Sequence, residues 1–489
     1  MQSSKFFKII FSIFIVALWF NLGATIEVPE NNIMQTFLIN SKSYDVGLIY
    51  VSEDSKDVSS MFGHSSIIFI NKENFLNSIV ISFLAEVDRS DHFISYVFNG
   101  VFGKYEGRFH KMPLFLYVNE YHLRERRNIF VYKFKNININ FLVENILKQE
   151  KVLDNYYFLT NNCSSLLDKV LANTLGFKDD FVKNDKVYQP YNLIEKHLSN
   201  LELLKVFYSL DVRFYKNLHD VSDSFKEQVL KNEPAEPSNR SEERFYRDYY
   251  DYVSSNQVPD GKKIIDNFQP IEDYDDLELG KLLTVKPISK FTIGIESRRN
   301  FIDYIFKAEL LSKDLIDNDF FGNSLKELKM LSADIYIHEQ KVHLDNIKIL
   351  KTMNIVDFSW PFYNLSSAFE TGYKKKYISS DSYTFLDYKL GISFKNDYYA
   401  STFFIGPIVE YSSSEFDFID SFNILLNSKI EDLEFKIGNE FSFFKNDFDS
   451  NVFFEFSKSA KNLTYSLNSK YFIDQNIAVF GFSIRFNSH

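Results

Sequence analysis

One thiol and one imidazole in this sequence have the residue types and positions that nucleophilic chemistry needs. Cys163 is the only cysteine in 489 residues, and it stands in Asn161-Asn162-Cys163-Ser164-Ser165. Asn162 is a favourable N-cap, and apolar residues at helical spacing follow it as far as Gly176. Cys163 is therefore predicted in the first turn of a helix, where unpaired N–H groups and the helix dipole favour a thiolate over a thiol.

The same helix start offers donors for a developing negative charge. The amide of Cys163, with the side chain of Asn162 or Asn161, is a candidate set of oxyanion donors. The alternative reading of this segment is a buried small residue that caps a core helix.

A thiolate needs a base, and His64 is the best candidate. It lies 163 − 64 = 99 residues upstream, in Phe62-Gly63-His64-Ser65-Ser66, at the start of a predicted strand. Imidazole can accept the thiol proton and return it to a leaving group near neutral pH. Ser66 shares a strand face with His64 and could orient the ring, but the third member of such a site stays open.

The first residues have the layout of a secretory signal peptide. Lys5 and Lys8 precede an apolar run from Ile9 to Phe20, and Leu22-Gly23-Ala24 then offers small residues for cleavage. The run is too short for a membrane helix. We expect residues 1–24 to be removed and the chain to be exported.

Composition excludes several classes of partner and site. With 55 Lys+Arg against 66 Asp+Glu, the net charge of −11 argues against nucleic acid as a partner. A single cysteine argues against a disulfide framework, and the lack of a spaced His/Asp/Glu set argues against a metal site. The sequence also lacks a phosphate-binding glycine loop, so we expect no cofactor. Arg124, Arg126 and Arg127 form a basic cluster that could hold a lipid phosphate or acidic headgroup; a solvated hairpin is the alternative.

The remaining chain divides into three parts by its periodicity. Residues 25–185 alternate strands and turns and end with the Cys163 helix, which predicts an α+β domain. Residues 186–285 read as a helical connector, with a helix from Arg240 and an acidic linker around residues 271–276. Residues 286–489 change to a period of two.

The period-two segments predict an antiparallel β-barrel. Leu386, Tyr388, Leu390, Ile392 and Phe394 alternate with polar or small residues, and similar runs continue to the end of a chain that contains 53 Phe and 30 Tyr. About 10–12 such segments, each near the length that crosses a bilayer as a tilted strand, are typical of an outer-membrane barrel with a polar lumen. A soluble β-sandwich is the alternative, and the stretch from Leu325 to Leu331 alternates poorly.

The motifs around the thiol resemble the Lnb N-terminal periplasmic domain family. The resemblance rests on Phe62-Gly63-His64 before Asn162-Cys163-Ser164, with Gly103-Lys104-Tyr105, Tyr121 to Arg127, Tyr157-Phe158 and Pro190-Tyr191-Asn192 in order. It implies a permuted papain-like, NlpC-type fold with Cys163 as nucleophile and His64 as general base. Members of the family move an acyl chain within bacterial lipoproteins through a cysteine thioester, but the Lnb enzymes carry membrane helices where this chain carries a predicted barrel.

Two classes of function follow from these features. The first is a cell-envelope cysteine acyltransferase or hydrolase that acts on a lipid, lipoprotein or amide substrate at the periplasmic face of the outer membrane. The second is a non-enzymatic outer-membrane barrel with a periplasmic binding or scaffold domain. Both place the protein in the periplasm and the bacterial outer membrane.

Overall fold

The computed structural model describes most of the chain from residue 41 onwards, and the predicted signal peptide and acidic linker lie outside the described residues. The described residues are 41–52, 63–87, 95–96, 99–100, 102–124, 127–151, 154–158, 160–176, 188–209, 213, 221–231, 235–257, 289–298, 301–313, 324–358, 364–375, 382–395, 398–412, 415–430, 433–444, 447–460, 463–473 and 476–488. The chain forms two compact units, one of residues 1–210 with 253–271 and one of residues 211–252 with 272–489.

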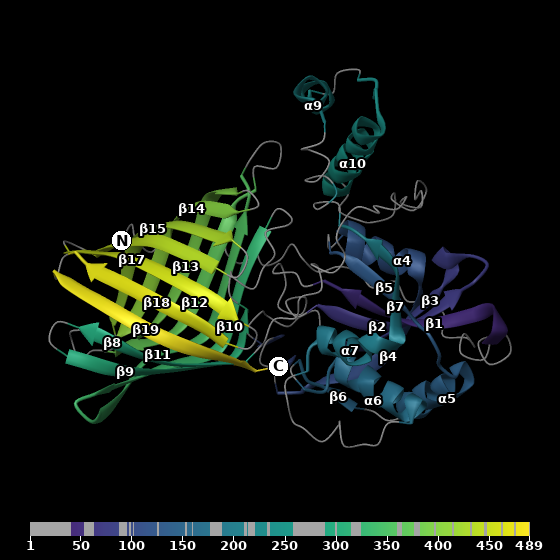
Figure 1. Ribbon diagram of the computed structural model, residues 1–489, viewed down its shortest axis with the longest axis horizontal. Helices are drawn as coiled ribbons and strands as arrows, with labels where there is room; N and C mark the ends of the chain where they lie inside the picture. Colours follow the sequence, from purple (N-terminus) through teal and green to yellow (C-terminus); the bar gives the residue numbers. More distant parts are fainter. Residues whose placement is uncertain are drawn as a thin grey trace. The chain divides into compact units, whose positions relative to one another are not determined.

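The first unit is built on an antiparallel sheet whose described strands have the order β6-β4-β3-β2-β1-β5-β7 (Figure 1). The strands are β1 (Tyr44–Val51), β2 (His64–Asn71), β3 (Ile79–Ala85), β4 (Tyr105–Pro113), β5 (Ile129–Phe134), β6 (Asp154–Tyr156) and β7 (Leu201–Phe207). The helices are α4 (Leu114–Val118), the π-helical η4 (Asn119–Arg124), α5 (Ile139–Glu150), α6 (Cys163–Leu175) and α7 (Pro190–His197), with short 3₁₀ turns η1 (Ser41–Ser43), η3 (Phe75–Asn77) and η6 (Leu198–Asn200).

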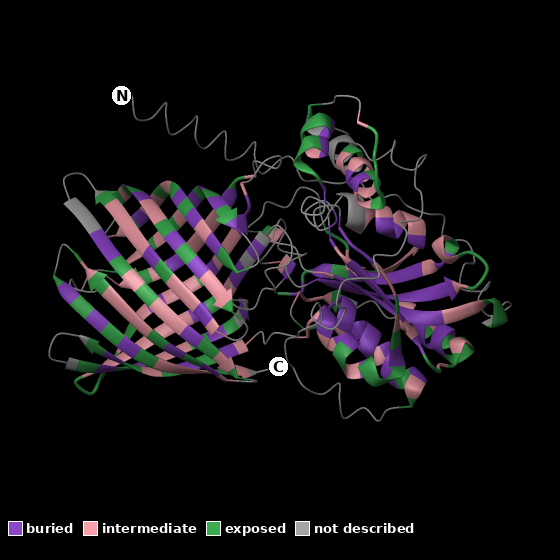
Figure 2. Ribbon diagram, turned by 45° about the horizontal axis from the view of Figure 1, so that its top comes forward, coloured by how far each residue is buried: buried purple, intermediate pink, exposed green. Residues whose placement is uncertain are grey.

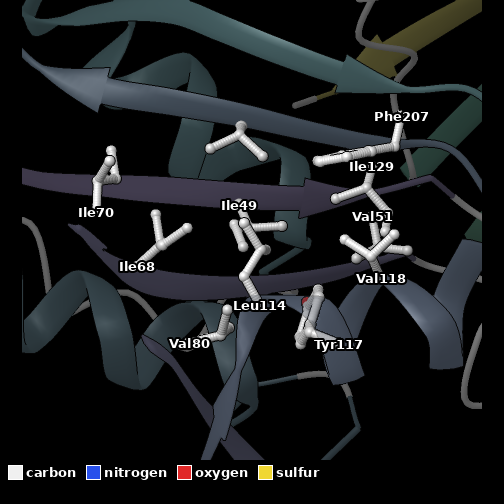
Figure 3. Packing of buried hydrophobic residues seen from close by; sticks show 11 residues of the cluster. Ile49, Val51, Ile68, Ile70, Val80, Leu114, Tyr117, Val118, Ile129 and Phe207 are labelled. Atoms are coloured by element: carbon white, nitrogen blue, oxygen red, sulfur yellow. The ribbon is translucent and has the colours of Figure 1, made fainter. Parts of the chain in front are cut away.

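Helices cover both faces of this sheet. On one face, α4 packs over an apolar cluster to which β1, β2 and β5 contribute alternate residues, among them Ile49, Ile68 and Ile129 (Figure 3). On the other face, α6 packs on β2 and β3, α7 packs on β1 and β2, and α5 packs on α6. Strands buried on both faces explain why β2 is almost continuously apolar after its first three residues.

The sheet continues beyond the predicted domain boundary at residue 185. Residues 201–207, which the helical periodicity placed in the connector, form the edge strand β7 and pair with β5. Their sequence, Leu-Glu-Leu-Leu-Lys-Val-Phe, is compatible with a strand, and the open edge of β5 supplies the backbone partners that a helix would otherwise provide internally.

Two helices follow in the connector. They are α9 (Asp223–Leu230) and α10 (Arg240–Gln257), and Phe225, Val229 and Phe245 pack between them. The helix predicted from Arg240 is therefore confirmed. Within the described residues, no helix combines the length and the hydropathy that crossing a bilayer requires.

The last part of the described chain closes into a twelve-stranded antiparallel barrel, in which β19 pairs with β8. Its strands are β8 (Ser289–Arg298), β9 (Phe301–Lys313), β10 (Ser324–His338), β11 (Lys341–Val356), β12 (Ser366–Lys375), β13 (Ser382–Lys395), β14 (Tyr399–Ser412), β15 (Glu415–Ile430), β16 (Leu433–Phe444), β17 (Asp447–Ala460), β18 (Leu463–Phe472) and β19 (Ile477–Ser488). The predicted α+β class with a C-terminal barrel is confirmed. The sandwich alternative is wrong, because one sheet closes on itself.

Burial alternates along the barrel strands, as Figure 2 shows in colour. On β14, Phe403 and Ile405 are exposed on the outer surface while Phe404 between them is buried. Outward side chains are largely apolar, and the buried inward ones include many Ser, Thr, Asn, Glu and Lys residues. This pattern is that of a barrel with a lipid-facing exterior and a polar interior.

The poorly alternating stretch near Leu331 has a local cause. Leu331 has a φ of 53° and is skipped in the pairing of β10 with both β9 and β11. Leu310 on β9 and Ile349 on β11, opposite it, are skipped as well, so the register is unchanged there and the left-handed backbone of Leu331 interrupts the regular alternation. The register of β10 against β11 shifts further on, between Asp334 and Ile335.

Candidate active site

His64 and Cys163 each stand at the beginning of an element, as the sequence predicts. His64 is the first residue of β2, and it pairs with Val51 at the end of β1. Gly63 before it has a φ of 81°, and a Cβ there would lie 2.8 Å from the Val51 carbonyl oxygen, so only glycine fits. Cys163 is the first residue of α6, which is capped by Asn162 and ends before Gly176.

A pair of serines joins the two elements next to these residues. Ser65 Oγ and Ser164 Oγ are hydrogen-bonded at 2.8 Å, which ties the start of β2 to the start of α6. The Cys163 thiol and the His64 imidazole are hydrogen-bonded to each other. Both are buried, with 4% and 6% of their surfaces exposed. Residues 99 positions apart in the chain are therefore direct neighbours.

The electrostatic surroundings of Cys163 favour its thiolate. Burial by itself raises the pKa of the thiol. The charge of the His64 imidazole and its hydrogen bond act in the opposite direction, and hydrogen bonds from the Ser164 side chain and the Ser65 backbone add to them. The net result is a Cys163 pKa lowered from 9.0 to about 6.

Tyr156 also lies at the candidate site, although no motif in the sequence indicates it. The backbone N–H of Cys163 donates a hydrogen bond of 3.3 Å to the Tyr156 hydroxyl. Burial, and then the neighbouring Cys163, raise the pKa of Tyr156 well above its usual value, so this phenol keeps its proton. Its ring stacks on Phe83, with centroids 5.5 Å apart. A tyrosine seven residues before the cysteine carries no signal by spacing alone, because β6 must first pair with β4 to bring it there.

Asn162 caps the helix rather than facing the thiol. Its Oδ1 accepts the N–H groups of Ser164 and Ser165 at 3.0 and 3.2 Å. Its Nδ2 donates to the carbonyl oxygens of Phe158 at 3.2 Å and Tyr188 at 2.6 Å. Both amide protons are thus engaged, which leaves none for an oxyanion. Asn161 donates its side-chain amide to the Asn155 carbonyl oxygen at 2.7 Å.

Comparison with protein families gives a match over this unit. Residues 37–199 match the Lnb N-terminal periplasmic domain. The chain carries an Lnb domain. The match confirms the resemblance drawn from the sequence motifs. None of the curated proteins compared with the chain matches it.

Solved structures similar to the chain include porins and other outer-membrane proteins. They include a KdgM porin in complex with disordered oligogalacturonate, with 11% identity and a TM-score of 0.27, covering 41% of this chain and 99% of that one. OmpT of Vibrio cholerae lacking loop L8 has 7% identity and a TM-score of 0.24, covering 40% and 97%. Outer membrane phospholipase A of Escherichia coli has 9% identity and a TM-score of 0.24, covering 42% and 99%. The barrel of this chain is established by its own strand pairing.

A periplasmic domain and a barrel of outer-membrane type therefore occur in one chain. The protein belongs to the periplasm and the outer membrane, as the sequence predicts. The apolar outer surface of the barrel is the part that meets lipid.

In the Lnb domain, Arg127 contacts His64 indirectly, through the Tyr121 ring. Its Nε donates to the Ser52 carbonyl oxygen at 2.6 Å, and its guanidinium lies over the Tyr121 ring at 5.3 Å. Tyr121 in turn stacks on His64, with centroids 5.7 Å apart. Arg127, a member of the predicted basic cluster, is therefore buried. The Arg124 side chain and Arg126 lie outside the described residues.

Ser66 takes part in a separate polar group of the Lnb domain. Its hydroxyl is hydrogen-bonded to Ser82 Oγ at 2.7 Å and to the Tyr117 hydroxyl at 3.0 Å. His64 Nε2 is buried and has no hydrogen-bond partner in the described part of the chain. The described residues therefore supply no orienting partner for the imidazole at that nitrogen.

A buried ionic group holds helix α6 in place. Asp168 on α6 accepts hydrogen bonds from Lys196 at 2.6 and 2.8 Å, and its Oδ1 lies 3.3 Å from His197 Nε2 on α7. Burial opposes ionisation of Asp168, but the hydrogen bonds from His197 and Lys196 outweigh it and lower the pKa of the carboxyl. The sequence gives no signal for this group, since Asp168 looks like a polar residue on the outer face of a helix.

Proposed function

We propose that the protein is a cell-envelope cysteine acyltransferase or hydrolase whose nucleophile is Cys163. The observation that carries the proposal is the buried thiol at the start of α6, hydrogen-bonded to His64 and with a pKa lowered to about 6. A thiol in such a place is ionised at neutral pH, whereas a structural buried cysteine is not.

The reaction begins with attack of the Cys163 thiolate on the carbonyl carbon of an ester or amide. The tetrahedral intermediate collapses to a thioester as the C–O or C–N bond breaks, and protonated His64 donates its proton to the leaving group. A second nucleophile, an amine in transfer or water in hydrolysis, then attacks the thioester while His64 takes its proton. The thiolate leaves and the site returns to its starting state.

The oxyanion of each tetrahedral intermediate needs donors close to the sulfur. The backbone N–H of Cys163 is one, and the Tyr156 hydroxyl beside it is the second. Tyr156 accepts from that N–H in the free protein, and its own proton can be donated to the substrate oxygen. This pair takes the place of the predicted Asn162 and Asn161 side chains: the Asn162 amide donates to two backbone carbonyls, and the Asn161 amide donates to the Asn155 carbonyl.

The presence of the barrel favours the proposal that the substrate is presented at a membrane. A catalytic domain fused to a membrane-embedded barrel stays at the outer membrane, where lipids and lipoproteins are concentrated. We therefore propose a lipid, lipoprotein or other acylated molecule as substrate, at the periplasmic face of that membrane.

The test uses a fluorescent vinyl sulfone, which alkylates thiolates, on the full-length protein in detergent at neutral pH. Loss of labelling in a Cys163→Ala variant is trivial, because no other thiol exists. The informative variant is His64→Ala, matched with His110→Ala, whose partly exposed ring lies 2.8 Å from Glu86 on the sheet edge.

We expect rapid labelling of the wild type and of His110→Ala, and much slower labelling of His64→Ala. A native wild-type protein that reacts no faster than the urea-unfolded chain would rule out an activated nucleophile. In that case the non-enzymatic reading, a barrel with a periplasmic scaffold domain, would take its place.

A further inference from the structure

We propose that the barrel is sealed: side chains fill its lumen near one end, so that it anchors the chain in the bilayer without conducting ions or solutes. This inference concerns the barrel alone and does not depend on the chemistry of Cys163. It distinguishes an anchor from a pore, which strand number alone does not, because twelve strands lie between the filled small barrels and the aqueous porins.

The seal is a cluster of apolar residues that we call the apolar plug. Its buried members are Leu325 on β10, Ile355 on β11, Ala400 and Phe404 on β14, and Leu425 on β15. Met353, Ala368 and Phe453 pack against it from β11, β12 and β17. β10 and β14 are separated by three strands in the barrel order, so these side chains must extend into the interior to belong to one cluster.

Exposure shows that the plug residues face inwards and that no water-sized space touches them. Phe404 is 1% exposed, whereas Phe403 beside it on the same strand is 43% exposed on the lipid side. Leu325 and Ile355 are fully buried. Side chains that line a water-filled channel would be accessible from the lumen, so the lumen is filled at this level.

Two glycines make room for the largest plug residues. A Cβ on Gly391 would lie 2.6 Å from the Phe404 ring, which belongs to its cross-strand partner. A Cβ on Gly438 would overlap the ring of Phe453, which is again the cross-strand partner. The inner wall is therefore shaped around these two rings, as expected of a built-in plug.

The backbone narrows the same end of the barrel. After β11, Asp357 forms a bridge to Ser393 on β13, and the Phe358 N–H donates to the Ser393 carbonyl oxygen at 2.7 Å. Beyond the start of β12, the chain that follows β11 thus pairs with β13, which is not a neighbour of β11 elsewhere. This is the end at which β8 begins and β19 ends, since Ser289 pairs with Ser488 there and antiparallel strands alternate in direction.

Ion pairs occupy the lumen next to the plug. Lys329 bonds Glu309 at 2.8 Å, and Lys351 bonds Glu327 at 2.9 Å. Lys348 and Glu370 lie 3.0 Å apart on the next pair of strands. Opposite charges held in contact attract a passing ion weakly, and an ion that crossed the plug would lose its hydration without gaining a free counter-charge.

The experiment records current across a planar lipid bilayer that contains the full-length protein. Two double variants are matched: Phe404→Ala with Phe453→Ala removes the plug rings, and Phe403→Ala with Phe454→Ala removes their outward-facing neighbours. Heat-modifiable migration on a gel verifies that each barrel is folded before recording.

We expect no discrete current steps from the wild type or from the outward-facing variant, and steps from the plug variant. Steps of a defined size from the wild type would overturn the proposal. If neither variant gives current steps, the apolar plug is not what seals the barrel. Neither result depends on labelling of Cys163, so failure here is distinct from failure of the proposed enzyme.

Discussion

Replacement of His64 by alanine is expected to abolish the acidity of Cys163. The imidazole is the principal source of the lowered thiol pKa, first through its charge and then through its hydrogen bond. Burial, which opposes the thiolate, remains when the ring is removed. The pKa of Cys163 should therefore rise from about 6 to at least its ordinary value of 9.0.

The size of this change follows from the two values. A fall in pKa from 9.0 to about 6 corresponds to about 4 kcal/mol in favour of the thiolate. At neutral pH, roughly nine-tenths of the wild-type thiol is then ionised, against about one-hundredth in the variant.

The single cysteine makes the titration simple to observe. In protein labelled with ¹³C at the cysteine Cβ, one resonance reports the ionisation of Cys163 alone, and its shift is followed against pH in detergent. Ser66→Ala is the matched control, because the Ser66 hydroxyl is bonded to Ser82 and Tyr117 rather than to the thiol. We expect this control to keep the wild-type midpoint. If His64→Ala also keeps a midpoint near 6, the reasoning on the source of the acidity is refuted.

Three further predictions follow from the contacts of the Lnb domain. Tyr156→Phe should lower kcat by about 100-fold by removing an oxyanion donor, while its neighbour Tyr157→Phe leaves kcat unchanged; equal rates would contradict the role of Tyr156. Arg127→Ala should lower kcat and shift its pH profile, because the Tyr121 ring that stacks on His64 loses its support; an unshifted profile would indicate a purely structural role. Asp168→Ala should cost about 3 kcal/mol of domain stability, measured by pulse proteolysis in urea, against under about 1 kcal/mol for the more exposed Asp45→Ala.

The Asp168 prediction carries a pH dependence with a defined sign. Its folded pKa is depressed below 3.8, so its contribution to stability is complete above that value and is lost as the pH falls through the folded pKa. The difference in unfolding free energy between the wild type and Asp168→Ala should therefore become smaller under strongly acidic conditions. A difference that stays constant down to the acid limit would contradict the ionic role.

Local features of the site could be predicted from the sequence, because they depend on neighbouring residues. The cap at Asn162, the stop at Gly176 and the strand start at His64 follow from short-range rules for backbone N–H groups and glycine. The barrel also followed, since alternation with a period of two is visible in each strand by itself.

Features that depend on long-range pairing could not be predicted in the same way. The position of Tyr156 depends on the pairing of β6 with β4, and β7 is a strand because β5 offers it an open edge. The Asn162 side-chain amide donates a hydrogen bond to the carbonyl oxygen of Tyr188, which is 26 residues away in the chain. The burial of Arg127 depends on Ser52, 75 residues away.

The most direct test of the account is the mass of the peptide that contains Cys163 after the full-length protein meets a diacylated lipopeptide as acyl donor. The account predicts that this peptide gains one acyl group, that hydroxylamine releases it as expected of a thioester, and that His64→Ala gains far less. A Cys163 peptide that stays unmodified while the donor is consumed would contradict the central claim.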